Sequence, residues 1–187
     1  MNTLRKRICS LVIAACLICM SVVPAMADST VTTAGTDTVS ASEVRTEAKA
    51  TARFLMDNTD FTDISNTSTF YNASRNLILS VRSGYDCSVQ ADAYLKSVDA
   101  LLNADGTLNL ENASSFANDI YSNYAYLLLT LAVLDKDAAD YNGINVVAAF
   151  DNIIANATSD ELTNNLNPYL LGAYYAAIAS YKDSLTN

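Results

Sequence analysis

The sequence contains no histidine and no tryptophan, and it has only five glycines, two prolines and four cysteines among 187 residues. Without histidine, Ser–His and Cys–His catalytic pairs and a zinc site with histidine ligands are excluded. Positive charge is also scarce, since eleven basic side chains face twenty acidic ones and give a net charge of −9. An acidic chain whose few cations do not cluster is a poor ligand for a phosphate backbone, so no nucleic-acid partner is expected.

The N-terminal segment has the three parts of a secretory signal peptide. Basic residues at 5–7 precede an apolar stretch of 16 residues at 8–23, and residues 24–27 end in an Ala-x-Ala cleavage site. The stretch is short for a membrane span of ~20 residues, and a lipoprotein processed at Cys16 would have a cramped apolar segment. Both alternatives are therefore less favoured. We predict a signal peptide at 1–27, secretion to the outside or surface of a bacterial cell, and no membrane contact after its removal.

Removal of this segment would change the balance of the chain. Eight basic and twenty acidic side chains would remain, a net charge of −12, together with one cysteine, Cys87. A single cysteine forms no internal disulfide, so the core must stabilise the fold, and a domain of roughly 150 residues buries enough surface to do so. We interpret Cys87 as a small apolar residue rather than a reactive thiol. Residues 28–39, rich in Thr, Ser and Asp, are predicted to be a disordered leader before a domain at 40–187.

From Ser40 onward the pattern predicts helices throughout, and therefore an all-α fold. Ser40 and Glu43 match a capping box before the first helix, and Gly84 is placed to end the second. Ser88 precedes the third helix, and Pro168 suits the first position of the sixth. The predicted helices span residues 41–57, 68–83, 89–103, 114–134, 145–156 and 168 onward.

The predicted helices are of two kinds. Those at 89–103 and 145–156 carry one apolar stripe, which is typical of outer helices. The segments Tyr124–Leu134 (YAYLLLTLAVL) and Tyr169–Tyr181 (YLLGAYYAAIASY) are apolar all round, which predicts inner helices buried on all sides. The aromatic residues that open successive inner helices are 51 and 48 residues apart. This alternation predicts three stacked helical hairpins.

One run carries a family resemblance. Between Asn118 and Phe150, the segments Leu134-Asp135-Lys136-Asp137 and Tyr141-Asn142-Gly143 follow an apolar helix and precede an amphipathic one. This unit resembles the inner-helix, turn and outer-helix unit of the terpenoid cyclase and protein prenyltransferase α/α-toroid superfamily, with Asp135 in place of the usual glycine. The resemblance implies a partial α/α-toroid over most of 40–187.

The catalytic motifs of that superfamily are not matched. The resemblance would place the acid motif D-x-D-D of protonating cyclases at 135–138, where the last Asp is missing. The zinc of protein prenyltransferases is held partly by histidine, and the sequence has none. The acidic residues at 135–140 also depart from a calcium loop, because position 5 is Ala139 and position 6, normally Gly, is Asp140. We therefore expect no enzyme, no cofactor and no metal site.

Tyrosine is the one abundant aromatic residue, with eleven copies. Tyrosines can line a ligand pocket, although they more often fill a core with the hydroxyl bonded at its edge. Arg75 and Arg82, on an otherwise apolar helix, are the cations expected to find an acidic partner inside the bundle, and for them a structural salt bridge is favoured over a ligand contact. The candidate ligand-binding residues are Tyr121, Tyr124, Tyr126, Tyr174, Tyr175 and Arg75.

Taken together, the sequence predicts a secreted, non-enzymatic helical binding or interaction module at the bacterial cell surface. Its partner would be a protein or a component of the cell envelope, and two half-rings could complete each other as a homodimer. The alternative is a carrier of an apolar or cobamide-like small molecule in a Tyr-lined concavity, as in the vitamin B12 carriers of similar architecture. A remote alternative is a remnant of a cyclase-type enzyme. An exposed apolar edge at the first or last hairpin would favour the interaction module, and an aromatic cluster facing a cavity would favour the carrier.

Overall fold

The computed structural model describes residues 31–32, 38–111, 120–160 and 171–181. The predicted signal peptide lies outside these residues, as do Pro168 and most of the predicted leader. The chain divides into two compact units, Met1–Thr51 and Ala52–Asn187. In the first unit, β1 (Val31–Thr32) pairs antiparallel with β2 (Thr38–Val39). The described residues are otherwise helices and their connections, which confirms the all-α prediction.

The helix starts follow the local sequence. In α2 (Ala41–Asp57), the Ser40 Oγ accepts from the Glu43 N–H at 3.2 Å and the Ser40 N–H donates to the Glu43 carboxylate at 2.8 Å, as a capping box requires. In α3 (Thr67–Arg82), Asn66 and Thr69 form a second capping box, and Gly84 follows with a φ of +75°. Both helices lie within one residue of their predicted bounds.

The third helix begins one residue earlier than predicted, at Ser88 and not after it. Ser88 is the first residue of α4 (Ser88–Leu101), Cys87 occupies the cap position, and the Asp86 carboxylate accepts from the Ser88 N–H at 3.1 Å. Asp86 thus accepts from an N–H of the first helical turn, whereas the Cys87 side chain at the cap position makes no such hydrogen bond. α6 (Val146–Ala155) begins behind Asn145, whose side chain accepts from the Ala148 N–H at 2.8 Å.

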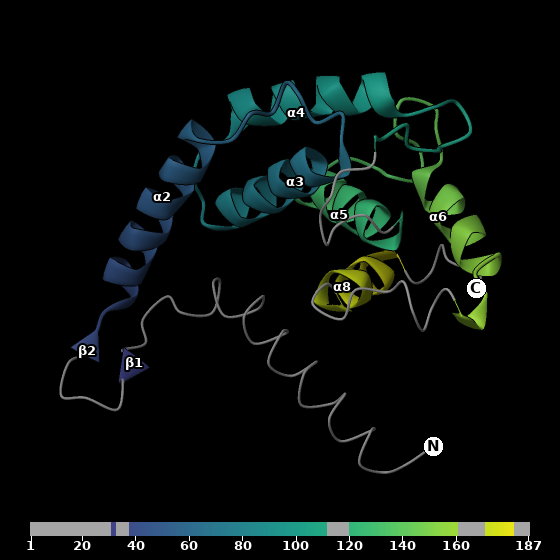
Figure 1. The fold of residues 1–187 in the computed structure, drawn as a ribbon. Helices are drawn as coiled ribbons and strands as arrows, with labels where there is room; N and C mark the ends of the chain where they lie inside the picture. The colour runs from purple at the N-terminus through teal and green to yellow at the C-terminus, as the bar shows by residue number, and fades with distance from the viewer. Residues whose placement is uncertain (1–30, 33–37, 112–119, 161–170, 182–187) are drawn as a thin grey trace, which may run out of the picture. The chain divides into compact units, whose positions relative to one another are not determined.

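In the second unit, α5 (Ile120–Val133) is the central helix. It packs against α3, α6 and α8 (Leu171–Tyr181), and α3 also packs against α4 (Figure 1). Nine side chains of α5 are buried, around its whole circumference, as predicted for an inner helix. In the amphipathic α4 and α6, burial is confined to one stripe, which contains Tyr94 and Val98 in α4 and Phe150 in α6.

The prediction that the last helix is buried on all sides is wrong. In α8, Ala177 is buried, whereas Tyr175 is 51% exposed and Ile178 is 39% exposed. α8 packs on α5 along one side, where the Tyr181 hydroxyl donates to the Leu128 carbonyl at 3.3 Å. An apolar circumference shows what a helix would gain from burial, but the described helices cover only the side of α8 that faces α5.

Two connections are fixed to the helices by hydrogen bonds. After α5, Asp135 takes a left-handed φ of +56°, and the Lys136 N–H returns to the Leu131 carbonyl at 2.9 Å, so Asp135 adopts the conformation that favours glycine at a helix end. Asn142 and Gly143, with φ of +52° and +81°, then form the tight turn typical of an Asn-Gly pair. This places the start of α6 directly after the turn.

Candidate functional site

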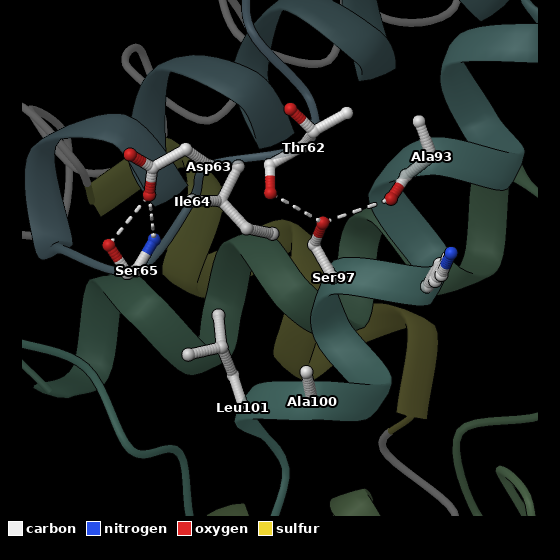
Figure 2. A pocket seen from close by; sticks show the side chains of 9 residues that line it. Thr62, Asp63, Ile64, Ser65, Ala93, Ser97, Ala100 and Leu101 are labelled. Atoms are coloured by element: carbon white, nitrogen blue, oxygen red, sulfur yellow. Dashed lines mark hydrogen bonds between the residues drawn. The ribbon is translucent and has the colours of Figure 1, made fainter.

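A groove of about 540 Å³ lies between residues 62–65 and α4 (Figure 2). Ile64 projects toward α4, and Ala93, Ser97, Ala100 and Leu101 of α4 line the opposite side. Ile64 is 1% exposed and belongs to the hydrophobic core, so the groove has an apolar floor continuous with the interior. Its size falls in the ~300–1,000 Å³ range of small-ligand pockets.

Hydrogen bonds hold the loop wall of the groove against α4. The Ser97 hydroxyl lies 3.0 Å from the Phe61 carbonyl and 3.2 Å from the Thr62 carbonyl, and it is also 3.1 Å from the Ala93 carbonyl of its own helix. A carboxylate oxygen of Asp63 accepts from the Ser65 hydroxyl at 2.7 Å (Figure 2). The loop is therefore fixed in place by hydrogen bonds to Ser97 of α4 and by the bond between Ser65 and Asp63 within the loop.

Just before the groove, Asp60 closes a small turn. Its carboxylate accepts from the Thr62 hydroxyl at 2.7 Å and from the Thr62 N–H at 2.8 Å. These two bonds lower the pKa of the Asp60 carboxyl, so it is charged at neutral pH. Sequence reasoning did not find this groove, because its two walls lie about thirty residues apart and carry no motif.

Of the predicted ligand-binding residues, Tyr124 is part of the core. Its ring stacks on Phe150 with centroids 5.9 Å apart, and its hydroxyl donates to the Gly106 carbonyl at 2.7 Å. Burial raises the pKa of Tyr124 to about 12. Tyr121 is also buried, 8% exposed. Both occupy the structural role that the sequence offered as the alternative to ligand binding.

Arg75 and Tyr126 both contact the ring of Tyr71. The Arg75 guanidinium lies 5.4 Å from the centre of the Tyr71 ring, and Tyr71 meets Tyr126 edge to face at 4.9 Å. Burial, and then the neighbouring Tyr71, raise the pKa of Tyr126. Arg75 also donates weakly to the Asn76 side chain, at 3.3 Å. Among the described residues Arg75 forms no salt bridge, so the salt-bridge interpretation is not supported there.

Of the remaining two candidates, Tyr175 does not join this cluster. Tyr175 is half-exposed on α8, and the side chain of Tyr174 lies outside the described part of the structure. The predicted residues therefore divide among the core, the α3–α5 contact and the surface of α8. The described ones do not line one concavity.

Two further tyrosine hydroxyls are engaged in the interior. Tyr94 shares a 2.7 Å hydrogen bond with Ser74, and burial raises its pKa to about 12. The Tyr141 hydroxyl and the Asn142 amide both donate to the Asp99 carboxylate, at 2.7 and 2.9 Å, which fastens the turn before α6 to α4. Both phenols are neutral at physiological pH and engaged in hydrogen bonds, which suits a structural role.

The acidic turn after α5 has no metal-binding geometry. In the described residues no three His, Cys, Asp or Glu side chains are grouped as a metal ion requires. Within the same residues, no helix combines the length and the apolar character that a membrane crossing needs.

No family model, curated protein or solved structure matches this chain. The resemblance to the α/α-toroid superfamily thus stays a prediction.

Proposed function

We propose that this protein is a secreted, non-enzymatic interaction module of the bacterial cell surface, which docks a protein partner on the outer side of α8. The observation that carries the proposal is the exposure of Tyr175 and Ile178 on a helix whose composition calls for burial. Tyr175 and Ile178 are three residues apart and therefore neighbours on the helix surface, and adjacent exposed apolar side chains are a common mark of a protein interface. An exposed apolar edge at the last hairpin is also the feature that the sequence offered as evidence for this function.

The place of α8 in the helix order supports the same proposal. Contacts run from α3 to α5 and from α5 to α8, the sequence of inner helices that a partial α/α-toroid of stacked hairpins would have. The terminal unit of a helical stack needs a polar outer face to stay soluble alone. α8 (LGAYYAAIASY), the outermost helix of this order among the described residues, has no charged residue, so it offers no such polar face. A further helical element, from a partner or from a second copy, would complete the stack.

The charge of the chain fits a module of this kind. With a sequence pI near 4.2, the surface away from α8 repels the anionic polymers of a cell envelope and limits nonspecific adhesion. Binding would then depend on the neutral face of α8. The carrier alternative has weaker support, because Tyr124 is committed to the core and Tyr175 faces outward.

The proposal can be tested by cosedimentation of the purified protein with isolated cell envelopes. The double variant Tyr175→Ser/Ile178→Ser is expected to lose binding, and protease treatment of the envelopes is expected to abolish binding of the unmodified protein. The matched control is Leu79→Ser/Val89→Ser, which removes apolar side chains that are 54% and 75% exposed elsewhere. Equal binding by the two double variants would reject α8 as the docking surface. Sedimentation equilibrium without envelopes would reveal self-pairing.

A further inference from the structure

The groove between residues 62–65 and α4 has a surface that none of the preceding functions uses. We propose that it binds a short apolar peptide in its zwitterionic form, with a free α-ammonium and a free α-carboxylate. This inference is independent of the docking surface on α8, because the groove and α8 share no residue.

The apolar part of the groove fits the side chains of such a peptide. Ile64 and Leu101 supply aliphatic walls, and Ala93 and Ala100, two turns apart on α4, leave space in front of the helix (Figure 2). The small residues of α4 lie between a branched residue on the loop, Ile64, and one at the end of α4, Leu101, which leaves room for aliphatic side chains of a ligand. Burial of such chains is favourable by ~25 cal/mol per Å² of apolar surface.

The charges of the groove specify the ends of the ligand. Lys96 and Asp63 are both exposed, both line the groove, and are not paired with each other. The one ion pair among the described residues joins Arg53 and Asp57. A simple anion would be attracted by Lys96 and repelled by Asp63, and a simple cation would meet the reverse. A ligand with both charges matches both groups, with its α-carboxylate at Lys96 and its α-ammonium at Asp63.

The groove is also organised in advance. The single Ser97 hydroxyl proton is shared among the carbonyls of Phe61 and Thr62 in the loop wall and Ala93 in its own helix, which ties the loop to α4. Ser65 fixes one oxygen of Asp63 at 2.7 Å. The other carboxylate oxygen of Asp63 remains available for an ammonium group. Binding then costs little ordering of the protein, which favours measurable affinity for a small ligand.

The test is a titration of the full chain, ¹⁵N-labelled, with the dipeptide Leu-Leu, followed by amide NMR. Shifts are expected at residues 62–65 and 93–101, with saturation at millimolar concentration. The capped analogue acetyl-Leu-Leu-amide has the same apolar body without the charges. Because each exposed ion pair contributes about three-fold, the capped peptide is expected to bind about ten-fold more weakly. Equal affinity of the two peptides, shifts located elsewhere, or no shifts would overturn the proposal.

Two variants separate the apolar and the charged contributions. Ala100→Trp fills the groove and is expected to abolish binding, whereas Lys96→Gln is expected to weaken Leu-Leu about three-fold and leave the capped peptide unchanged. Asp92→Asn, on the same helix but outside the groove, is the matched control. Its affinity for Leu-Leu is expected to stay within a factor of ~2 of the unmodified protein's. The Tyr175→Ser/Ile178→Ser variant should bind the peptide normally, so failure of one proposal leaves the other testable. If Ala100→Trp does not fold, as judged by circular dichroism, Lys96→Gln alone decides.

Discussion

Replacement of Gly106 by alanine tests the contact between the turn after α4 and the start of α6. Gly106 has a φ of +82°, and a Cβ at this position would lie 2.7 Å from the Cβ of Ala149 and 3.4 Å from the Asn145 carbonyl oxygen. Its own carbonyl accepts the 2.7 Å bond from the buried Tyr124 hydroxyl. The added methyl group therefore meets α6 while the backbone is held by α5.

The expected loss of stability has two parts. An alanine in the left-handed region costs about 1–2 kcal/mol, and an extra methyl group in a closely packed site costs about 1–3 kcal/mol. Gly106→Ala is expected to lower the free energy of unfolding by the sum, about 2–5 kcal/mol. Gly143→Ala is the matched control, because Gly143 has a φ of +81° and no atom within 4 Å of the added Cβ. Gly143→Ala is expected to lower the free energy of unfolding by about 1–2 kcal/mol, the cost of the backbone conformation alone.

Urea unfolding of both variants and the unmodified protein, followed by far-ultraviolet circular dichroism, gives the two losses from the shift in midpoint at constant slope. The difference between the variants measures the close approach of Gly106 to α6. If Gly143→Ala were as destabilising as Gly106→Ala, the backbone conformation alone would explain the loss, and the argument from packing at Ala149 would be refuted.

Four other outcomes are expected. Asp135→Gly should stabilise the protein by about 0.5–1 kcal/mol in the same unfolding assay, because glycine suits the left-handed end of α5; a loss would show that the Asp135 side chain contributes there. Tyr124→Phe should lose about 1 kcal/mol by removing the bond to Gly106, whereas an unchanged midpoint would mean that this bond contributes no net stability. Stability should be intact below pH ~10, the pKa of an unfolded tyrosine, and fall as pH rises toward the folded value of about 12 for Tyr94 and Tyr124, since the folded state binds these protons more tightly. At pH ~11 the fully buried Tyr94 accounts for about 1.4 kcal/mol and Tyr124 for less. Urea midpoints that do not change between pH ~9 and ~11 would contradict the raised values. Cys87 is 5% exposed and burial raises the pKa of its thiol, so a thiol reagent should modify it slowly in native protein and rapidly in urea.

The sequence predicts which segments are helical and, for most of them, whether the helix is inner or outer. Capping residues, turn residues and the apolar pattern of each segment determine both properties locally. The capping side chain of Ser40 and the Asn142-Gly143 turn act within a few residues and lie where the sequence shows them. The start of α4 was predicted one residue late, because Asp86 and Ser88 are both good acceptors for a helix start and the structure uses Asp86.

Features that depend on distant segments could not be predicted. The groove forms between Ile64 of the loop and Ala100 of α4, and no periodicity in the sequence links these two positions. The exposure of Tyr175 depends on what packs beyond α8, since an apolar helix has the same sequence whether or not a neighbour covers it. The tyrosine candidates lie in different parts of the structure and could not be sorted from the sequence, because residue type alone does not distinguish a phenol in the core from one in a pocket.

The central position of α5 has a consequence for how the protein is made. Its partners include α3, synthesised earlier, and α8, synthesised last among the described helices. At ~5–20 residues per second, the ribosome needs roughly two to ten seconds to proceed from the end of α5 to the end of α8. During that interval the side of α5 that α8 later covers, which includes Leu128, stays exposed. The nascent chain therefore carries one side of its central helix uncovered, in a form that chaperones can bind, until α8 has been synthesised.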